Sequence, residues 1–216
     1  MTLIVAVDGP AAAGKGTLAR RLAETLGLPY LDTGLLYRAV GRRVLDAGGD
    51  PANAAAAEGA AQALQPADLQ RSDLRGPQAD AAAAAVASIA GVRAALLAFQ
   101  RNFASPHGAV LDGRDIGTVI FPDAAAKLFV TASLAERARR RWLELRAKGE
   151  QADIATVEED MRQRDAKDAA RASAPLKAAA DAFLLDTSDM DAEAAFQSAI
   201  AFIRIRFDIA TAKGIA

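Results

Sequence analysis

Short apolar runs alternate with longer amphipathic stretches along the chain. The apolar runs end in polar or glycine turns and predict buried strands at residues 3–7, 109–111, 127–131 and 183–185, with a weaker one at 29–31. Helical spacing predicts helices over residues 15–26, 34–47, 79–104, 133–148, 156–169 and 191–212. Because short strands that alternate with helices are typical of a parallel sheet covered on both faces, the sequence predicts an α/β fold.

Length, charge and composition narrow the class of protein. A chain of 216 residues suits one sizeable domain. The formal charge of −1 gives no global reason to bind a nucleic acid polymer or an anionic membrane. Without cysteine there is no disulfide, thiolate metal site or cysteine nucleophile. Residues 1–7 are too short for a secretory segment, and no apolar run approaches 18 residues without charges, so we expect a soluble, cytoplasmic protein.

The segment after the first predicted strand has the spacing of a phosphate-binding loop. Gly9 is followed after four residues by Gly14 and Lys15, directly before a predicted helix. Glycine lets the loop turn its backbone N–H groups toward phosphate, and the lysine adds a positive charge for the β and γ phosphates of ATP. The alternative, a glycine-rich turn without a ligand, is less consistent with this context. The predicted ATP-binding residues are Gly9, Pro10, Ala11, Ala12, Ala13, Gly14, Lys15, Gly16 and Thr17.

Residues that follow two further predicted strands are suited to bind Mg²⁺ or phosphate. Asp112 ends a strand where an aspartate could meet Mg²⁺ directly or through water, and Thr17 is the second candidate for the metal. An ordinary Asp-Gly turn is the alternative for Asp112. Arg38 lies one helical turn after Gly34, so its guanidinium can reach the same rim of the sheet and bind phosphate through two parallel hydrogen bonds.

Basic residues concentrate between residues 137 and 148, where six of them stand against the single acid Glu144. Further on, Arg164, Asp168 and Arg171 have the spacing of one helix face. A salt-bridged solvent face is the alternative, but such pairs contribute only about 0.2–0.5 kcal/mol each. Phosphoryl transfer gives a stronger reason, because positioned arginines stabilise the charge of its transition state. We therefore predict a lid whose Arg137, Arg140 and Arg141 close over the γ-phosphate, with Lys15 and Arg38 as the other catalytic residues.

Taken together, these motifs resemble the bacterial cytidylate kinases, a family of nucleoside monophosphate kinases, over nearly the whole chain. The Gly-Lys-Gly-Thr form of the phosphate loop resembles these kinases more than the GTPases. The longest matching string runs from Asp112 to Asp123, Gly-Arg-Asp-x-Gly-Thr-x-x-Phe-Pro-Asp in its core. The other matches are residues 8–10 with 14–17, 31–34 with 37–38, 92–93 with 100–101, and 171–172 with 174–176. The resemblance implies a P-loop kinase fold with a five-stranded parallel sheet, an acceptor-binding insertion and a lid.

The resemblance also implies the acceptor site. Thr33 and Arg38 would help to hold the acceptor, Arg93 and Asp115 would read cytosine, and Arg164 and Asp168 would contact phosphate and ribose, with Arg114 and Arg171 in the same site. Cytosine offers an amino donor beside two acceptors, so a carboxylate and a guanidinium satisfy it, whereas uracil places an acceptor and a donor there. We therefore predict ATP-dependent phosphorylation of CMP and dCMP over UMP.

This sequence departs from the family in two places. Ala84 occupies the position of a serine that the family usually has near the base, so that hydroxyl is missing or is replaced by Ser88 or water. The segment after residue 46 is also shorter than in many relatives and lacks their small β-strand element. The CMP-versus-dCMP preference is consequently open.

The sequence is also compatible with two other functions. A kinase for UMP or AMP is the nearest alternative, and a P-loop switch is a further one, although no Asn-Lys-x-Asp guanine-reading segment is present. We expect a monomer with ATP and CMP or dCMP as its small-molecule partners. The single domain would comprise a core at about residues 1–45, 105–135 and 180–216, a helical acceptor-binding insertion at about 46–104, and a lid at about 137–171.

Overall fold

The structure is a computed structural model that describes residues 2–104, 107–171 and 174–207. Its backbone forms two compact units, Met1–Leu31 with His107–Ala216, and Asp32–Pro106. The second unit therefore begins at residue 32, directly after the second strand, whereas the sequence predicted an insertion from about residue 46. The difference arises because α2 (Thr33–Asp46) packs mainly with helices of that unit.

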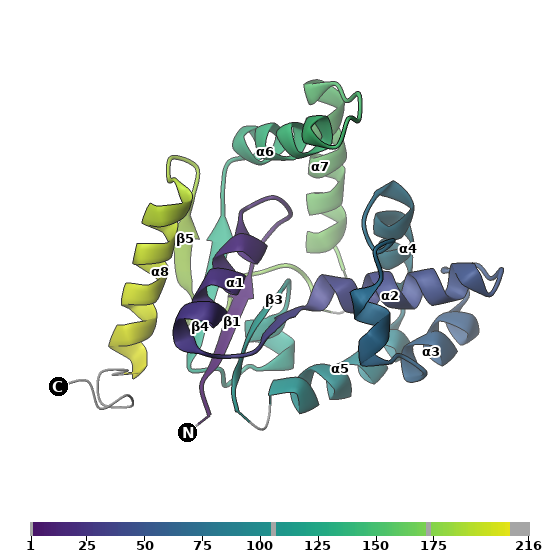
Figure 1. The fold of residues 1–216 in the computed structure, drawn as a ribbon, viewed down its shortest axis with the longest axis horizontal. Helices are drawn as coiled ribbons and strands as arrows, with labels where there is room; N and C mark the ends of the chain where they lie inside the picture. Colours follow the sequence, from purple (N-terminus) through teal and green to yellow (C-terminus); the bar gives the residue numbers. More distant parts are fainter. Residues whose placement is uncertain (1, 105–106, 172–173, 208–216) are drawn as a thin grey trace. The chain divides into compact units, whose positions relative to one another are not determined.

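A five-stranded sheet forms the centre of the first unit (Figure 1). All five predicted strands are confirmed, and they lie side by side in a parallel sheet of order β2-β3-β1-β4-β5. Asp8 at the end of β1 pairs in register with Gly113 on one side and Phe129 on the other. The loops that follow these three strands consequently leave the sheet at the same edge. The strands are β1 (Ile4–Asp8), β2 (Tyr30–Asp32), β3 (Ala109–Gly113), β4 (Ala126–Thr131) and β5 (Phe183–Asp186).

One face of this sheet is covered by α1 (Lys15–Leu26) and α8 (Ala192–Phe207), which contact each other (Figure 1). Their aliphatic side chains and those of alternate strand residues, such as Val5 and Val7, form the main hydrophobic core. The predicted end of the last helix, residues 208–212, lies outside the described residues.

Two helices, α6 (Leu134–Ala147) and α7 (Ile154–Ala169), form the predicted lid segment and pack against each other. The buried side chains of Ala138, Val157 and Met161 join them. Residues Ala11 and Ala12 of the phosphate loop pack against this small cluster. The lid therefore lies against the loop that the sequence assigns to ATP.

The second unit is helical, as predicted. It contains α2, α3 (Ala54–Gln62), the 3₁₀ helix η1 (Pro66–Gln70), α4 (Pro77–Ala87) and α5 (Ala90–Ala104). The prediction of one helix over residues 79–104 is wrong, because α4 and α5 meet at an angle of 99°. Ser88 ends α4 by donating its hydroxyl to the carbonyl of Ala85, and Gly91 at the start of α5 lets the side chain of Glu58 approach closely.

No single helix among the described residues is long and apolar enough to cross a membrane, while the bent pair of α4 and α5 together has the length and composition of such a span.

The segment after β3 contains an element that the sequence did not predict. Residues Ile116–Ile120 form the π-helix η2, in which the carbonyl of Asp115 accepts from Val119 and Ile120 and that of Ile116 accepts from Phe121. A single turn of this kind leaves no periodic pattern to detect. It packs on β1 and β3.

Candidate active site

The phosphate loop joins β1 to α1 in a conformation that requires glycine at its first position. Gly9 has a φ of +144°, and a Cβ there would lie 1.9 Å from the carbonyl oxygen of Val130. At the other end, Gly14 precedes α1 with a φ of +87°, and no side chain caps the helix. The first N–H groups of α1 therefore remain directed at the loop, as a phosphate site needs.

Lys15 is buried at the start of α1, with 6% of its surface exposed. Its ammonium donates to the carbonyl of Pro10 at 2.9 Å, across the loop. Burial, and to a smaller extent the positive charge of Arg114, lowers the pKa of Lys15 to about 7. A bound phosphate would favour the charged lysine, so this residue is suited to an anionic ligand.

Asp112 lies so close to Gly16 that it leaves little room for the serine or threonine that many P-loops have at this position. A Cβ at Gly16 would lie 3.1 Å from a carboxylate oxygen of Asp112 and 3.7 Å from the hydroxyl of Tyr30. That hydroxyl donates to the same Asp112 oxygen at 3.1 Å. Asp112 thus lies against the first turn of α1, which also carries the exposed Thr17.

These residues fit Mg²⁺ only together with a nucleotide. Among the residues that the structure describes, no group of three or more His, Cys, Asp or Glu is arranged to hold a metal ion. Mg²⁺ bound with nucleotides usually takes one or two protein oxygens and completes its shell with phosphate and water. The Asp112 carboxylate and the Thr17 hydroxyl are a donor set of that kind.

Arg137 connects the lid to the phosphate loop. Arg137 is buried, with 6% of its surface exposed, and its guanidinium donates to the carbonyls of Ala132 at 2.9 Å and Ala11 at 3.5 Å. It also pairs with Asp165 of α7 at 2.7 Å. The other carboxylate oxygen of Asp165 is buried and has no hydrogen-bond partner among the described residues. Arg137 is therefore held beside the loop by both lid helices.

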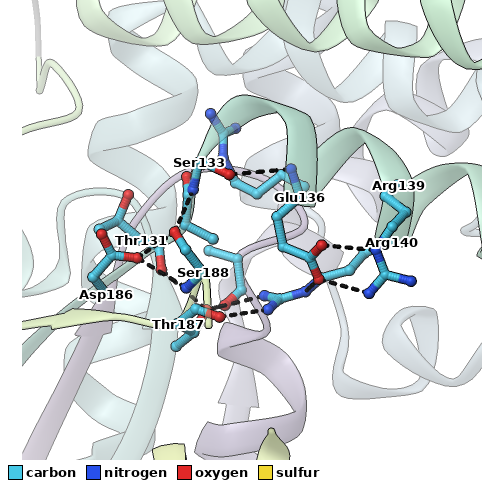
Figure 2. A network of polar contacts seen from close by, with 11 residues as sticks. Thr131, Ser133, Glu136, Arg139, Arg140, Asp186, Thr187 and Ser188 are labelled. Atoms are coloured by element: carbon cyan, nitrogen blue, oxygen red, sulfur yellow. Dashed lines mark hydrogen bonds and ion pairs between the residues drawn. The ribbon is translucent and has the colours of Figure 1, made fainter. Parts of the chain in front are cut away.

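Arg140 joins the lid to the loop after β5, as Figure 2 shows. Its guanidinium donates to Glu136 at 2.9 Å, to the Thr187 hydroxyl at 3.0 Å and to the Thr187 carbonyl at 2.6 Å. The Thr187 hydroxyl also lies 3.2 Å from the carbonyl of Ala13. A Cβ at Gly14 would lie 3.9 Å from Arg140. Arg140 is thus placed at the phosphate loop, whereas Arg141 pairs with Glu144 at 2.9 Å along α6.

Five of the predicted acceptor residues lie in the first unit. Asp115 is 6% exposed and directly precedes η2. Asp168 is buried and bridges Arg114 at 3.0 Å and Arg171 at 2.5 Å. Because α7 ends at Ala169, the prediction that Arg171 lies on its helical face is wrong, although the pairing with Asp168 is present. The charges of Arg114 and Arg164 both lower the pKa of Lys15, so these cations lie in its field.

The other acceptor residues lie in the second unit. The guanidinium of Arg38 folds back over Gly34, where a Cβ would lie 3.0 Å from it, and pairs with Asp80 of α4 at 3.0 Å. Arg93 of α5 lies over the ring of Tyr37, 5.8 Å from its centre. Thr33 is buried at the start of α2. The hydroxyl of Ser88 is engaged with the Ala85 carbonyl, which argues against its replacing the serine absent at Ala84.

Sequence reasoning missed the residues that hold the arginines. Asp80, Asp165 and Thr187 each bind a predicted site arginine, at distances of 2.7–3.0 Å. None belongs to a recognisable motif, and each lies at least 28 residues from its partner along the chain. Their roles depend on tertiary contacts alone. An acidic residue in the first turn of a helix, such as Asp80, is too common a signal to have singled it out.

The fold and the phosphate loop with its arginine-bearing lid define a P-loop kinase, an enzyme that transfers a phosphoryl group from ATP. Comparison with known proteins gives the family. The cytidylate kinase family model matches residues 5–204, and the chain belongs to that family.

Relatives named cytidylate kinase support the assignment. The protein of Granulibacter bethesdensis is 61% identical and that of Paramagnetospirillum magneticum 60% identical, each over 94% of this chain and 98% of its own length. That of Acidiphilium cryptum is 62% identical over 91% of this chain and 93% of its own. A solved structure of an uncharacterized protein from Eubacterium ventriosum has a TM-score of 0.53 at 13% identity, covering 93% of this chain and 98% of that one, and shows the fold alone.

Proposed function

We propose that this kinase phosphorylates CMP and dCMP in preference to UMP, and that Asp115 and Arg93 make the choice. The carrying observation is the buried carboxylate of Asp115, which lies two residues after the end of β3 in the family string. Such a carboxylate accepts from the amino group of cytosine and meets only an acceptor in uracil. A buried polar group left unpaired costs about 1–3 kcal/mol, enough to discriminate.

The reaction needs positioning and charge more than covalent help from the protein. The phosphate loop and Lys15 would hold the β and γ phosphates of ATP, with Arg137 and Arg140 beside them. Asp112 and Thr17 would hold Mg²⁺, which when bound would neutralise part of the phosphate charge. Arg114, Arg164 and Arg171, with Asp168 between two of them, would orient the acceptor phosphate, together with Thr33 and Arg38.

Steady-state assays with CMP, dCMP, UMP and AMP test this function. We expect kcat/KM to be highest for CMP and dCMP and at least about tenfold lower for UMP, as one unpaired buried group predicts. Asp115→Asn replaces a pure acceptor by a group that also donates, so the CMP/UMP ratio should fall by about tenfold. Faster turnover of UMP or AMP by the unmodified enzyme would contradict the proposal.

An unchanged CMP/UMP ratio in Asp115→Asn would show that the base is read elsewhere. Asp123→Asn is the matched control, because it makes the same chemical change in the same family string at an exposed position. The ratio of the control should equal that of the unmodified enzyme.

A further inference from the structure

Asp8 is a buried carboxylate that the mechanism above does not use. It is the last residue of β1 and is 5% exposed. Val5 and Val7 of the same strand belong to the core under α1 and α8. Because side chains alternate along a strand, Asp8 points to the opposite face, where η2 packs on β1.

Both oxygens of Asp8 are bound by the backbone that follows Asp115. One accepts from the N–H of Ile116 at 2.8 Å and the other from the N–H of Gly117 at 2.7 Å. These are the first two residues of η2, so the carboxylate fixes the two peptide groups on the carboxyl side of Asp115. Asp115 itself has φ −143° and ψ 22°, outside the helix that it starts.

Gly117 lies between the side chains of Asp8 and Lys127. A Cβ at this position would lie 3.4 Å from an Asp8 oxygen and 3.2 Å from the side chain of Lys127. Lys127, in β4, anchors the far end of the same segment, because its ammonium binds the Pro122 carbonyl and pairs with Asp181 at 2.9 Å. The segment from Ile116 to Pro122 is thus held at both ends, near Asp115 by Asp8 and away from it by Lys127.

The charge of Asp8 is costly where it lies. Burial raises the pKa of Asp8 to about 6, although the N–H groups of Gly117 and Ile116 oppose the rise. Asp115 raises the pKa as well, and Lys15 of α1 lowers it; the Lys127 side chain passes on the other side of Gly117. Near pH 7 the carboxylate is mainly ionised and can accept from both amides.

We propose that Asp8 is a positioning residue for the acceptor base. By holding the amides of Ile116 and Gly117, it fixes the backbone from which Asp115 projects. Its own backbone continues into Gly9, so one residue ties the start of the phosphate loop to the base-reading segment. This inference rests on the proposed role of Asp115.

The test is Asp8→Asn, which keeps the shape of the side chain but leaves a single oxygen that can accept. The amide NH₂ group would face the second backbone N–H and cannot accept from it. We expect KM for CMP to rise about ten- to a hundredfold, because a displaced positioning group has effects of this size. The ratio of kcat/KM for CMP to that for UMP should fall. KM for ATP should change by less than about threefold, since the loop keeps Lys15 and its amides. Lys127→Met is the matched control, and its KM for CMP should stay within about threefold of the unmodified enzyme.

The outcomes separate the hypotheses. If the unmodified enzyme does not prefer CMP in this assay, the proposed function fails, whatever Asp8 does. If the unmodified enzyme does prefer CMP, an Asp8→Asn variant with unchanged KM for CMP and unchanged CMP/UMP ratio overturns the role of Asp8. An equal rise of KM for ATP, or an equal effect of Lys127→Met, overturns it too, because either would mark a general structural role.

A measurement on the unmodified protein covers the case in which Asp8→Asn does not fold. In the absence of nucleotides, the amide proton resonances of Ile116 and Gly117 should shift together between about pH 5 and about pH 7, because protonation weakens the acceptor that they share. The amide of Phe121, which donates to the carbonyl of Ile116, is the internal reference and should shift less. If the Asp8 carboxyl itself titrates while the amide resonances of Ile116 and Gly117 stay unchanged, the proposal is overturned.

Discussion

Arg139 and Arg140 are neighbours on α6 with different surroundings. Both donate to Glu136, whose pKa falls to about 2 because Arg139 and then Arg140 bind it. The side chain of Arg139 is 55% exposed and that of Arg140 is 25% exposed. Arg140 also donates to the hydroxyl of Thr187, which lies beside the phosphate loop (Figure 2). Sequence position alone does not separate the two.

We predict that Arg140→Ala lowers kcat for CMP by at least about tenfold, because a guanidinium beside the phosphate loop is lost and positioned arginines contribute strongly to phosphoryl transfer. Arg139→Ala should leave kcat within about twofold, since an exposed ion pair contributes little. Initial rates at saturating ATP and CMP measure both. An equal loss in the two variants would show that the charge of α6 matters and the position of Arg140 does not.

Asp168 shows how the structure changes the meaning of a residue that the sequence had selected. The resemblance implies that it contacts the acceptor. In the structure its two oxygens bind Arg114 and Arg171, one each. Asp168 therefore holds two cations at a set distance, and these can bind one phosphate from two sides.

At the scale of elements, the phosphate loop depends on close contact between strands. Gly9 leaves β1 against β4, where the carbonyl of Val130 occupies the space of a Cβ. Gly27 ends α1 with a φ of +65°, and apart from its chain neighbours and the backbone of α1 no atom of the described residues lies within 4 Å of its Cβ position. Both glycines have a positive φ, but only the first has no room for a side chain.

We predict that Gly9→Ala destabilises the fold by at least about 3 kcal/mol and abolishes turnover, because backbone strain adds to a collision with another backbone. Gly27→Ala should cost only about 1–2 kcal/mol, the cost of a left-handed alanine, and should leave kcat unchanged. Urea unfolding and initial rates measure the two effects. Similar losses of stability in both variants would contradict the part assigned to Val130.

The elements were predicted with uneven success, for physical reasons. The five strands followed from short apolar runs, because both faces of a parallel strand are buried. The sequence joined α4 to α5 because the alanine-rich pattern continues across Ser88, where a local hydrogen bond and packing on α3 decide the bend. The π-helix η2 was missed because Asp8, more than a hundred residues away, binds its first amides.

At the scale of the whole molecule, the buried lysine of the active site opposes stability. The pKa of Lys15 falls from 10.5 in the unfolded chain to about 7, mainly because of burial. Between these pH values the unfolded chain holds a proton that the folded chain lacks. Stability must therefore rise with pH across this window, by an amount on the order of a few kcal/mol, and the charged lysine destabilises the fold at pH 7 and below.

We predict that Lys15→Met is more stable than the unmodified protein at pH 7 while its turnover is lost. The difference in unfolding free energy should shrink as the pH rises from about 7 toward 10, because the lysine of the unmodified protein becomes neutral. Urea unfolding without nucleotide at several pH values measures this. A variant less stable than the unmodified protein at pH 7 would contradict the prediction.

The sequence by itself determined the α/β class, the five strands, the phosphate loop and the family, because these depend on local patterns and on motifs of adjacent residues. It also selected the site residues as candidates; their roles remain predictions. Only the tertiary structure decided which partners hold them: Asp8 for the amides after Asp115, Thr187 for Arg140 and Asp80 for Arg38. Such contacts join residues far apart in the chain, so no local pattern encodes them.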